Sequence, residues 1–131
     1  MSMAGGCQCG SVRYEIAGAP VELVVCHCKE CQLQSGSAFG MSLFVADGAF
    51  RLTAGGLKSF QVVCDSGRVK TCAFCGDCGT RIYHSTAGKI SVKPGTLDNT
   101  RWLRPTHHYW TQRRQPWVVI PEDAVCVVDD G

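Results

Sequence analysis

Ten cysteines in a chain of 131 residues constrain this protein more than any other feature of its sequence. Seven of them stand in tight groups with C-x-C, C-x-C-x2-C and C-x2-C spacing: Cys7, Cys9, Cys26, Cys28, Cys31, Cys75 and Cys78. Thiols so close along the chain bridge one another poorly but converge well on one metal ion. The stretch MSMAGGCQCG lacks the basic start and apolar run of a secretory signal. We therefore expect a cytoplasmic protein in which metal, rather than disulfides, engages the cysteines.

Two of these groups complement each other as the halves of one closed metal site. GGCQCG presents Cys7 and Cys9, and FCGDCGT presents Cys75 and Cys78, with a glycine after each pair that permits a tight turn. Four thiolates are a common ligand set of a structural zinc ion. This partition predicts a structural site that ties an early loop to a late one.

The group CHCKEC offers three thiols, Cys26, Cys28 and Cys31, and lacks an evident fourth partner. A metal with three protein ligands keeps one coordination position open for water or a substrate, as catalytic zinc sites do. Three thiolates make zinc a weak electrophile that suits a soft ligand such as a thiol. We therefore expect sulfur chemistry at a second zinc ion, which makes about two ions per chain.

The remaining cysteines and the histidine inside the second group have several interpretations. Cys64 and Cys126 stand in apolar, strand-like runs and are predicted to be buried thiols. Core packing is also favoured for Cys72, although CAFCGDC would let it compete for the first site or cap the second. His27 could carry protons or act as a fourth ligand, but an extended backbone would point it away from its neighbours, which favours a supporting or structural role.

Short strands separated by turns dominate the rest of the sequence. SVRYEI places Val12, Tyr14 and Ile16 on one face, and DG and GG interrupt the later runs. The only plausible helical turn is KECQLQSG at 29–36, which Gly36 ends. We therefore predict a mainly β fold with little helix, organised as a single domain over residues 1–131.

Charge and hydropathy argue against several classes of function. A net charge of +2, with 18% charged residues, is too mild for nucleic-acid binding, and basic and aromatic residues do not interleave. No apolar stretch approaches the length of a membrane span. The expected partner is a small molecule, with neither nucleic acid nor membrane involved, and the oligomeric state is left open.

Five stretches, taken in order, resemble the glutathione-dependent formaldehyde-activating enzyme (GFA) family, also known as the CENP-V domain family: GGCQCGSVRYEI, VVCHCKECQLQSGSAF, FCGDCGTRIYH, KPGTLDN and PWVVIPED. The resemblance covers almost the whole chain and implies an Mss4-like β-tent fold with two zinc ions. Cys72 is an extra thiol outside the family pattern. The resemblance matches the family's structural ligands to Cys7, Cys9, Cys75 and Cys78, and its catalytic ligands to Cys26, Cys28 and Cys31.

The founding activity of that family is a carbon–sulfur lyase reaction, the condensation of formaldehyde with glutathione to S-(hydroxymethyl)glutathione. The resemblance therefore implies an enzyme that handles a thiol–aldehyde adduct, with glutathione as the expected thiol. The alternative is a non-catalytic binding module of the same fold in which both zinc ions are structural. A filled fourth position on the second zinc would favour the module, and an open one would favour the enzyme.

Several other residues carry weaker expectations. Asp98 in PGTLDN is assigned to a turn, with a role near a zinc ion as the lesser alternative. In HHYW, His107 and Tyr109 share one strand face and His108 lies on the other, which favours ordinary strand histidines over a pocket wall. Trp117 is predicted to lie in the core. Four nearby arginines could attract substrate carboxylates or only face solvent: Arg101, Arg104, Arg113 and Arg114.

Overall fold

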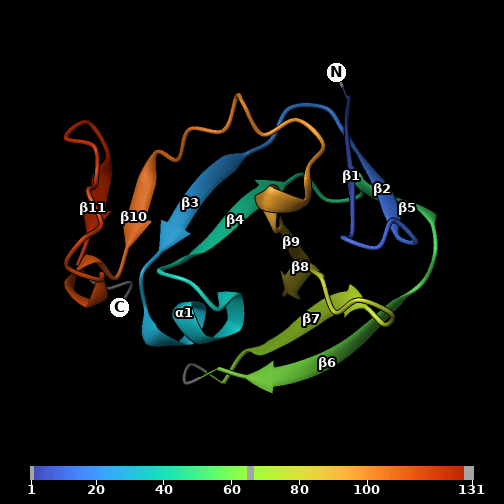
Figure 1. Cartoon of the computed structure of the whole chain (residues 1–131), viewed down its shortest axis with the longest axis horizontal. Coiled ribbons are helices and arrows are strands. Elements are labelled where there is room, and N and C mark those ends of the chain that lie inside the picture. Colours follow the sequence, from blue (N-terminus) through green and yellow to red (C-terminus); the bar gives the residue numbers. More distant parts are fainter. Residues whose placement is uncertain (1, 65–66, 129–131) are drawn as a thin grey trace. The chain divides into compact units, whose positions relative to one another are not determined.

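The computed structural model describes residues 2–64 and 67–128, and over them the prediction of a mainly β protein is confirmed. Within these residues one short α-helix and two 3-10 turns accompany the strands (Figure 1). The chain divides into two compact units, whose described parts are residues 2–21, 43–64 and 67–102 for the first, and 22–42 and 103–128 for the second. Each unit contains one of the predicted metal groups.

Two antiparallel sheets build the first unit. The small sheet has the order β1 (Ser2–Gly6), β2 (Arg13–Ala17) and β5 (Phe50–Ala54). Of the larger sheet, this unit contains five strands, in spatial order β4 (Gly40–Val45), β9 (Lys89–Val92), β8 (Arg81–Thr86), β7 (Val69–Cys75) and β6 (Leu57–Val63). β4 enters this unit at Leu43. Because most neighbours in space are also neighbours in sequence, the unit is built largely of hairpins.

The core of the first unit contains the alternating residues that the sequence predicts. Val12, Tyr14 and Ile16 are fully buried. Phe50 of the small sheet reaches the larger sheet, because its ring centroid lies 5.1 Å from that of Tyr14 and 5.0 Å from that of Tyr83. Aromatic pairs at this spacing stabilise a core beyond the area that they bury.

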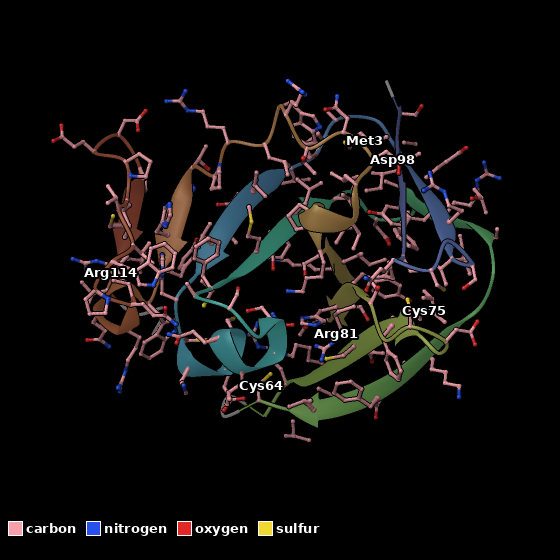
Figure 2. All side chains as sticks on the ribbon, in the orientation of Figure 1. Met3, Cys64, Cys75, Arg81, Asp98 and Arg114 are labelled. Atoms are coloured by element: carbon pink, nitrogen blue, oxygen red, sulfur yellow. The ribbon has the colours of Figure 1, made fainter. Side chains whose placement is uncertain are left out.

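A close approach at Gly5 fixes one side of the small sheet. Tyr14 Oη lies 2.6 Å from Thr96 Oγ1, in the 3-10 turn η1 (Pro94–Thr96). A Cβ atom at Gly5 would come within 2.4 Å of Tyr14 Oη, so only glycine leaves room for this bond. Two residues after η1, the Asp98 N–H donates to a β1 carbonyl at 3.0 Å, and Figure 2 shows Asp98 beside Met3.

The second unit combines three parallel strands with the helix. β10 (His107–Tyr109) lies between β3 (Glu22–Cys26) and β11 (Val125–Val127) and runs parallel to both. A 3-10 turn, η2 (Thr111–Arg113), follows β10. The predicted helical turn is confirmed as α1 (Lys29–Ser35), which ends at Gly36 in the left-handed conformation with φ 64°.

Three predictions about burial are wrong and one is confirmed. Trp117 is 68% exposed because WVVIP forms a turn and loop, where the flanking prolines cannot donate ladder bonds. Cys126 is exposed on β11, and Cys64 is half-buried at the turn that joins β6 to β7 (Figure 2). Cys72 is 1% exposed, as predicted for a core thiol.

Over the described residues, no helix combines the length and the apolar character that crossing a membrane requires.

Candidate metal centres

The first cysteine group is assembled from two hairpin turns of the first unit, between β1 and β2 and between β7 and β8, and consists of Cys7, Cys9, Cys75 and Cys78. The Gly10 N–H closes the first turn with a hydrogen bond to Cys7 O at 3.1 Å, and the Gly79 N–H closes the second with one to Cys75 O at 2.8 Å. Both glycines have positive φ, 83° and 81°. They let each turn direct two cysteines to the same point.

The sulfur atoms of this group have the spacing of a four-thiolate metal site. All four lie within 4.8 Å of one another. Cys9 Sγ is 3.5 Å from Cys7 Sγ and 3.8 Å from Cys75 Sγ. Sulfur ligands of a tetrahedral zinc ion, each about 2.3 Å from the metal, are roughly 3.8 Å apart. The donor set therefore fits a metal of that size.

Backbone and hydroxyl donors favour the thiolate, the form that binds a metal, at two cysteines of this group. Burial opposes ionisation of Cys7, but the Val12 N–H, 3.2 Å from its sulfur, and the neighbouring side chains lower the pKa of Cys7 to about 7. Thr80 lowers the pKa of Cys78 to about 5 through its hydroxyl, 3.2 Å from the sulfur, and through its N–H. The two thiols are thus prepared for a cation.

Thr80 connects the two turns, because its hydroxyl accepts from the Gln8 N–H at 3.1 Å and lies 3.2 Å from Cys78 Sγ. Thr80→Val keeps the shape and removes the hydroxyl. We expect the metal affinity of this group to fall roughly ten- to hundredfold, the usual effect of losing a group that supports a ligand. Competition with a chromophoric zinc chelator measures the affinity. Thr86→Val, at the far end of β8, is the control, and equal affinities in the two variants would contradict the role of Thr80.

The second group lies at the junction of β3 and α1 and consists of Cys26, Cys28 and Cys31. Their sulfur atoms lie within 4.8 Å of one another, and all three residues are half-buried. Cys28 is the N-cap of α1, and its sulfur accepts from the Cys31 N–H at 3.3 Å. The start of the helix therefore turns the three cysteines to one point.

Mutual repulsion disfavours three thiolates at this point in the absence of a cation. The neighbouring Cys26 thiol, together with burial, raises the pKa of Cys31 well above its usual range. Burial raises the pKa of Cys28, and Cys26 adds to that effect. A divalent cation would reverse both effects, because it stabilises coordinating thiolates. The group therefore fits a metal ion by its chemistry as well as by its spacing.

The second group has no fourth protein ligand among the described residues. No further His, Cys, Asp or Glu in that part of the chain places a ligand atom within 4.8 Å of all three sulfurs. His27 turns away from the cysteines, since it is fully buried and its Nε2 lies 2.9 Å from His108 Nδ1. A metal held here would keep one coordination position for another ligand.

Two contacts hold the cysteine loop within the second unit. The rings of His27 and His108 stack with centroids 5.2 Å apart, and burial lowers the pKa of both, so the pair is neutral near pH 7. Gln32 on α1 donates from Nε2 to His27 O at 2.9 Å and to Arg113 O at 3.1 Å. The loop is thereby fixed from its strand side and from its helix side.

Other residues singled out in the sequence belong to neither group. Asp98 lies in a turn, as predicted, and Arg13 binds both of its carboxylate oxygens at 2.9 and 2.5 Å, which lowers the pKa of Asp98. His107 Nδ1 lies 3.2 Å from a carboxylate oxygen of Glu22. Cys72 is outside both groups.

The sequence analysis missed the hydroxyl groups that support the first site. Ser11 Oγ lies 3.2 Å from Cys9 Sγ and 3.5 Å from Cys75 Sγ, and Thr80 has the corresponding place beside Cys78. A signal for both exists in the sequence, because each hydroxyl follows a Cys-Gly pair, in CGS and in CGT. Gln32 was also missed, and its helical position alone gives no sign of its backbone partners.

Fold and site together define a mainly β protein with one closed four-cysteine group and one open three-cysteine group, either of which could bind a metal. The chain belongs to the GFA family, whose sequence model, described as glutathione-dependent formaldehyde-activating enzyme, matches residues 2–113. None of the curated proteins matches it. Among solved structures, a Rhodobacter sphaeroides protein matches with a TM-score of 0.58 at 21% sequence identity, over 76% of this chain and 93% of that chain. That likeness supports the fold alone.

Proposed function

We propose that this protein is a zinc-dependent carbon–sulfur lyase of the GFA type. It would join a small thiol to formaldehyde, or split the thiol–formaldehyde adduct in the reverse direction. The observation that carries the proposal is the three-cysteine group, for which the described residues offer no fourth ligand. Membership of the family supports it. Glutathione is the expected thiol, S-(hydroxymethyl)glutathione the expected adduct, and the cytoplasm the expected compartment. Because the family match extends over both units, we treat residues 1–131 as one domain.

Two zinc ions would complete this enzyme. A structural ion would be held by Cys7, Cys9, Cys75 and Cys78, and a catalytic ion by Cys26, Cys28 and Cys31. When bound, the catalytic ion would supply Lewis-acid stabilisation of a thiolate at its open position. Because three thiolates already donate to the site, a soft sulfur ligand suits that position better than a hard oxygen ligand.

The reaction makes a modest demand on the residues of the chain. In the forward direction the thiol sulfur attacks the carbonyl carbon of formaldehyde, a carbon–sulfur bond forms, and the thiol proton ends on the new hydroxyl oxygen. The chain positions the three sulfur donors. Gln32 fixes the backbone of the loop that carries the three cysteines, through its hydrogen bond to His27 O. His27 and His108 form a buried neutral pair, so they add no charge to the site.

Exchange spectroscopy by NMR tests this activity, because formaldehyde and glutathione also combine without an enzyme. We expect the exchange rate between glutathione and S-(hydroxymethyl)glutathione to rise in proportion to the protein concentration. The acceleration should disappear after chelation and return when zinc is restored, with about two zinc ions per chain in the active protein. An exchange rate equal to the uncatalysed one, in protein with both ions present, would favour the non-catalytic binding module.

A further inference from the structure

The larger sheet of the first unit carries all of its strand charge on one face. Its five strands contain no Asp or Glu. Strand pairing places every basic residue on the same side, which we call the basic face: Lys58, Lys70, Arg81 and Lys89 of the strands, and Lys93 just after β9. Like charges gathered on one sheet face repel one another and disfavour the fold unless something compensates them.

The register of three strands shows how the centre of the basic face is built. Cys72 on β7 lies opposite His84 on β8, and His84 lies opposite Ser91 on β9. Residues two positions apart along a strand share a face. Lys70 therefore shares the face of Cys72, and Lys93, whose backbone is extended with φ −77° and ψ 104°, shares the face of Ser91.

A β-bulge adds Arg81 to the basic face. Regular pairing would place Ile82 opposite Phe74, but Arg81 takes that place and Ile82 is the extra residue. Without the bulge, Arg81 and His84 would point to opposite faces, since three positions separate them. Instead Arg81 Nη1 lies 2.8 Å from His84 Nε2. Figure 2 labels Arg81, which is the first residue of β8.

Two contacts fix the orientation of the Arg81 guanidinium group. Its Cζ lies 5.1 Å from the centroid of the Phe60 ring, a cation–π contact on the same face. Its donation to His84 Nε2 makes that nitrogen the unprotonated one. A guanidinium group held in a defined plane is prepared to bind an oxyanion through paired N–H donors.

Three cationic residues act on His84. Burial lowers the pKa of His84, and the charges of Lys93, Lys70 and Arg81 lower it further, to about 3. His84 is 6% exposed and the three cationic residues are half-buried, so solvent screens their charges less than at an open surface. Protonation of His84 would add a fourth positive charge to this group, whereas an anion would be attracted by the same three charges.

We infer that the centre of the basic face, between Lys70, Arg81 and Lys93, binds a small-molecule oxyanion, either a carboxylate or a phosphate group. Arg81 supplies directional donors, and the two lysines supply compact charges. The cations are half-buried side chains of neighbouring strands rather than exposed tips, which suits a small ion better than a polymer. This site uses none of the cysteines of the two metal groups.

Calorimetric titration of the metal-loaded protein with inorganic phosphate, and separately with succinate, tests the site. We expect at least one of the two to bind with a dissociation constant of roughly 1 mM or below. Stronger binding of phosphate would identify a phosphate site, and stronger binding of succinate a carboxylate site. NMR of the His84 ring should show its pKa rising when the ion is bound, because the anion offsets the three cations. No binding of either ion up to about 10 mM would overturn the inference.

Charge-matched variants separate this site from general surface charge. Lys70→Gln and Lys93→Gln should each weaken binding by roughly tenfold, the size of one charge-assisted hydrogen bond. Lys89→Gln is the control, because it removes the same charge from the same face at an exposed position. It should change the dissociation constant less than about twofold. Equal weakening in all three variants would show that the ion follows net charge only, which would overturn the inference.

Discussion

Cys75→Ser will unfold the first unit and abolish metal binding by its four-cysteine group. The sulfurs of Cys9 and Cys75 lie 3.8 Å apart although 66 positions separate them, so a metal held there would close a long loop. Structural zinc contributes an apparent free energy of about 10–16 kcal/mol in small domains, whereas a whole domain is stable by about 5–15 kcal/mol. Losing one thiolate therefore removes a large share of the stability. Circular dichroism melting, with metal analysis of the same sample, measures both losses.

Cys126→Ser is the matched control for that experiment. It makes the same thiol-to-hydroxyl change at an exposed cysteine outside both groups, and it should melt like the parent protein. Cys9→Ser should behave as Cys75→Ser does, because the two residues contribute to the same group from different turns. If Cys75→Ser melts at the temperature of Cys126→Ser, the four cysteines do not hold a structural metal.

Cys28→Ser should give a folded protein that retains one metal ion and has lost its thiol chemistry. The three sulfurs of the second group come from the single stretch CHCKEC, so their metal closes little chain and adds little to folding. Serine is itself a favoured N-cap residue, so α1 keeps its first hydrogen bond. The exchange rate of S-(hydroxymethyl)glutathione should fall to the uncatalysed rate, because the open coordination position is lost with the metal.

Calorimetry with glutathione across a pH series tests the same variant without relying on turnover. The parent should bind glutathione more tightly as the pH rises toward the pKa of the glutathione thiol, since binding requires the thiolate. Cys28→Ser should not bind it. Cys64→Ser is the control, a half-buried cysteine outside both groups. Equal binding by the parent and Cys28→Ser would place the thiol site elsewhere in the protein.

The grouping of the seven cysteines could be predicted because ligand spacing is a local property. C-x-C and C-x2-C pairs followed by glycine form turns that bring neighbouring sulfurs to one point, and the first group assembles in this way. The second group is brought together by the start of α1. The alternation of Val12, Tyr14 and Ile16 could be read for a similar reason, since strand period alone determines which residues share a face. The roles of the seven cysteines as zinc ligands stay a prediction.

The features that escaped prediction depend on pairings between distant segments. Within β8 alone, strand alternation puts Arg81 and His84 on opposite faces, and only the register with β7 reveals the extra residue Ile82. Trp117 has the composition of a core residue, but the flanking prolines exclude the strand that would bury it. The apolar character of Trp117 therefore predicted burial wrongly, because backbone hydrogen bonding decided whether its segment could form a strand.

The four-cysteine group also sets an order of events on the ribosome. Synthesis proceeds from the N-terminus, so seven thiols emerge before Cys75. They belong to Cys7, Cys9, Cys26, Cys28, Cys31, Cys64 and Cys72. A metal ion that meets the nascent chain at that stage can take thiol ligands only from this early set, which allows the second group but also combinations that the finished fold does not contain. The closed site forms only after Cys78 has emerged, by ligand exchange or by late loading. Expression with a slow, buffered supply of zinc should therefore yield more correctly loaded protein than expression with abundant free metal.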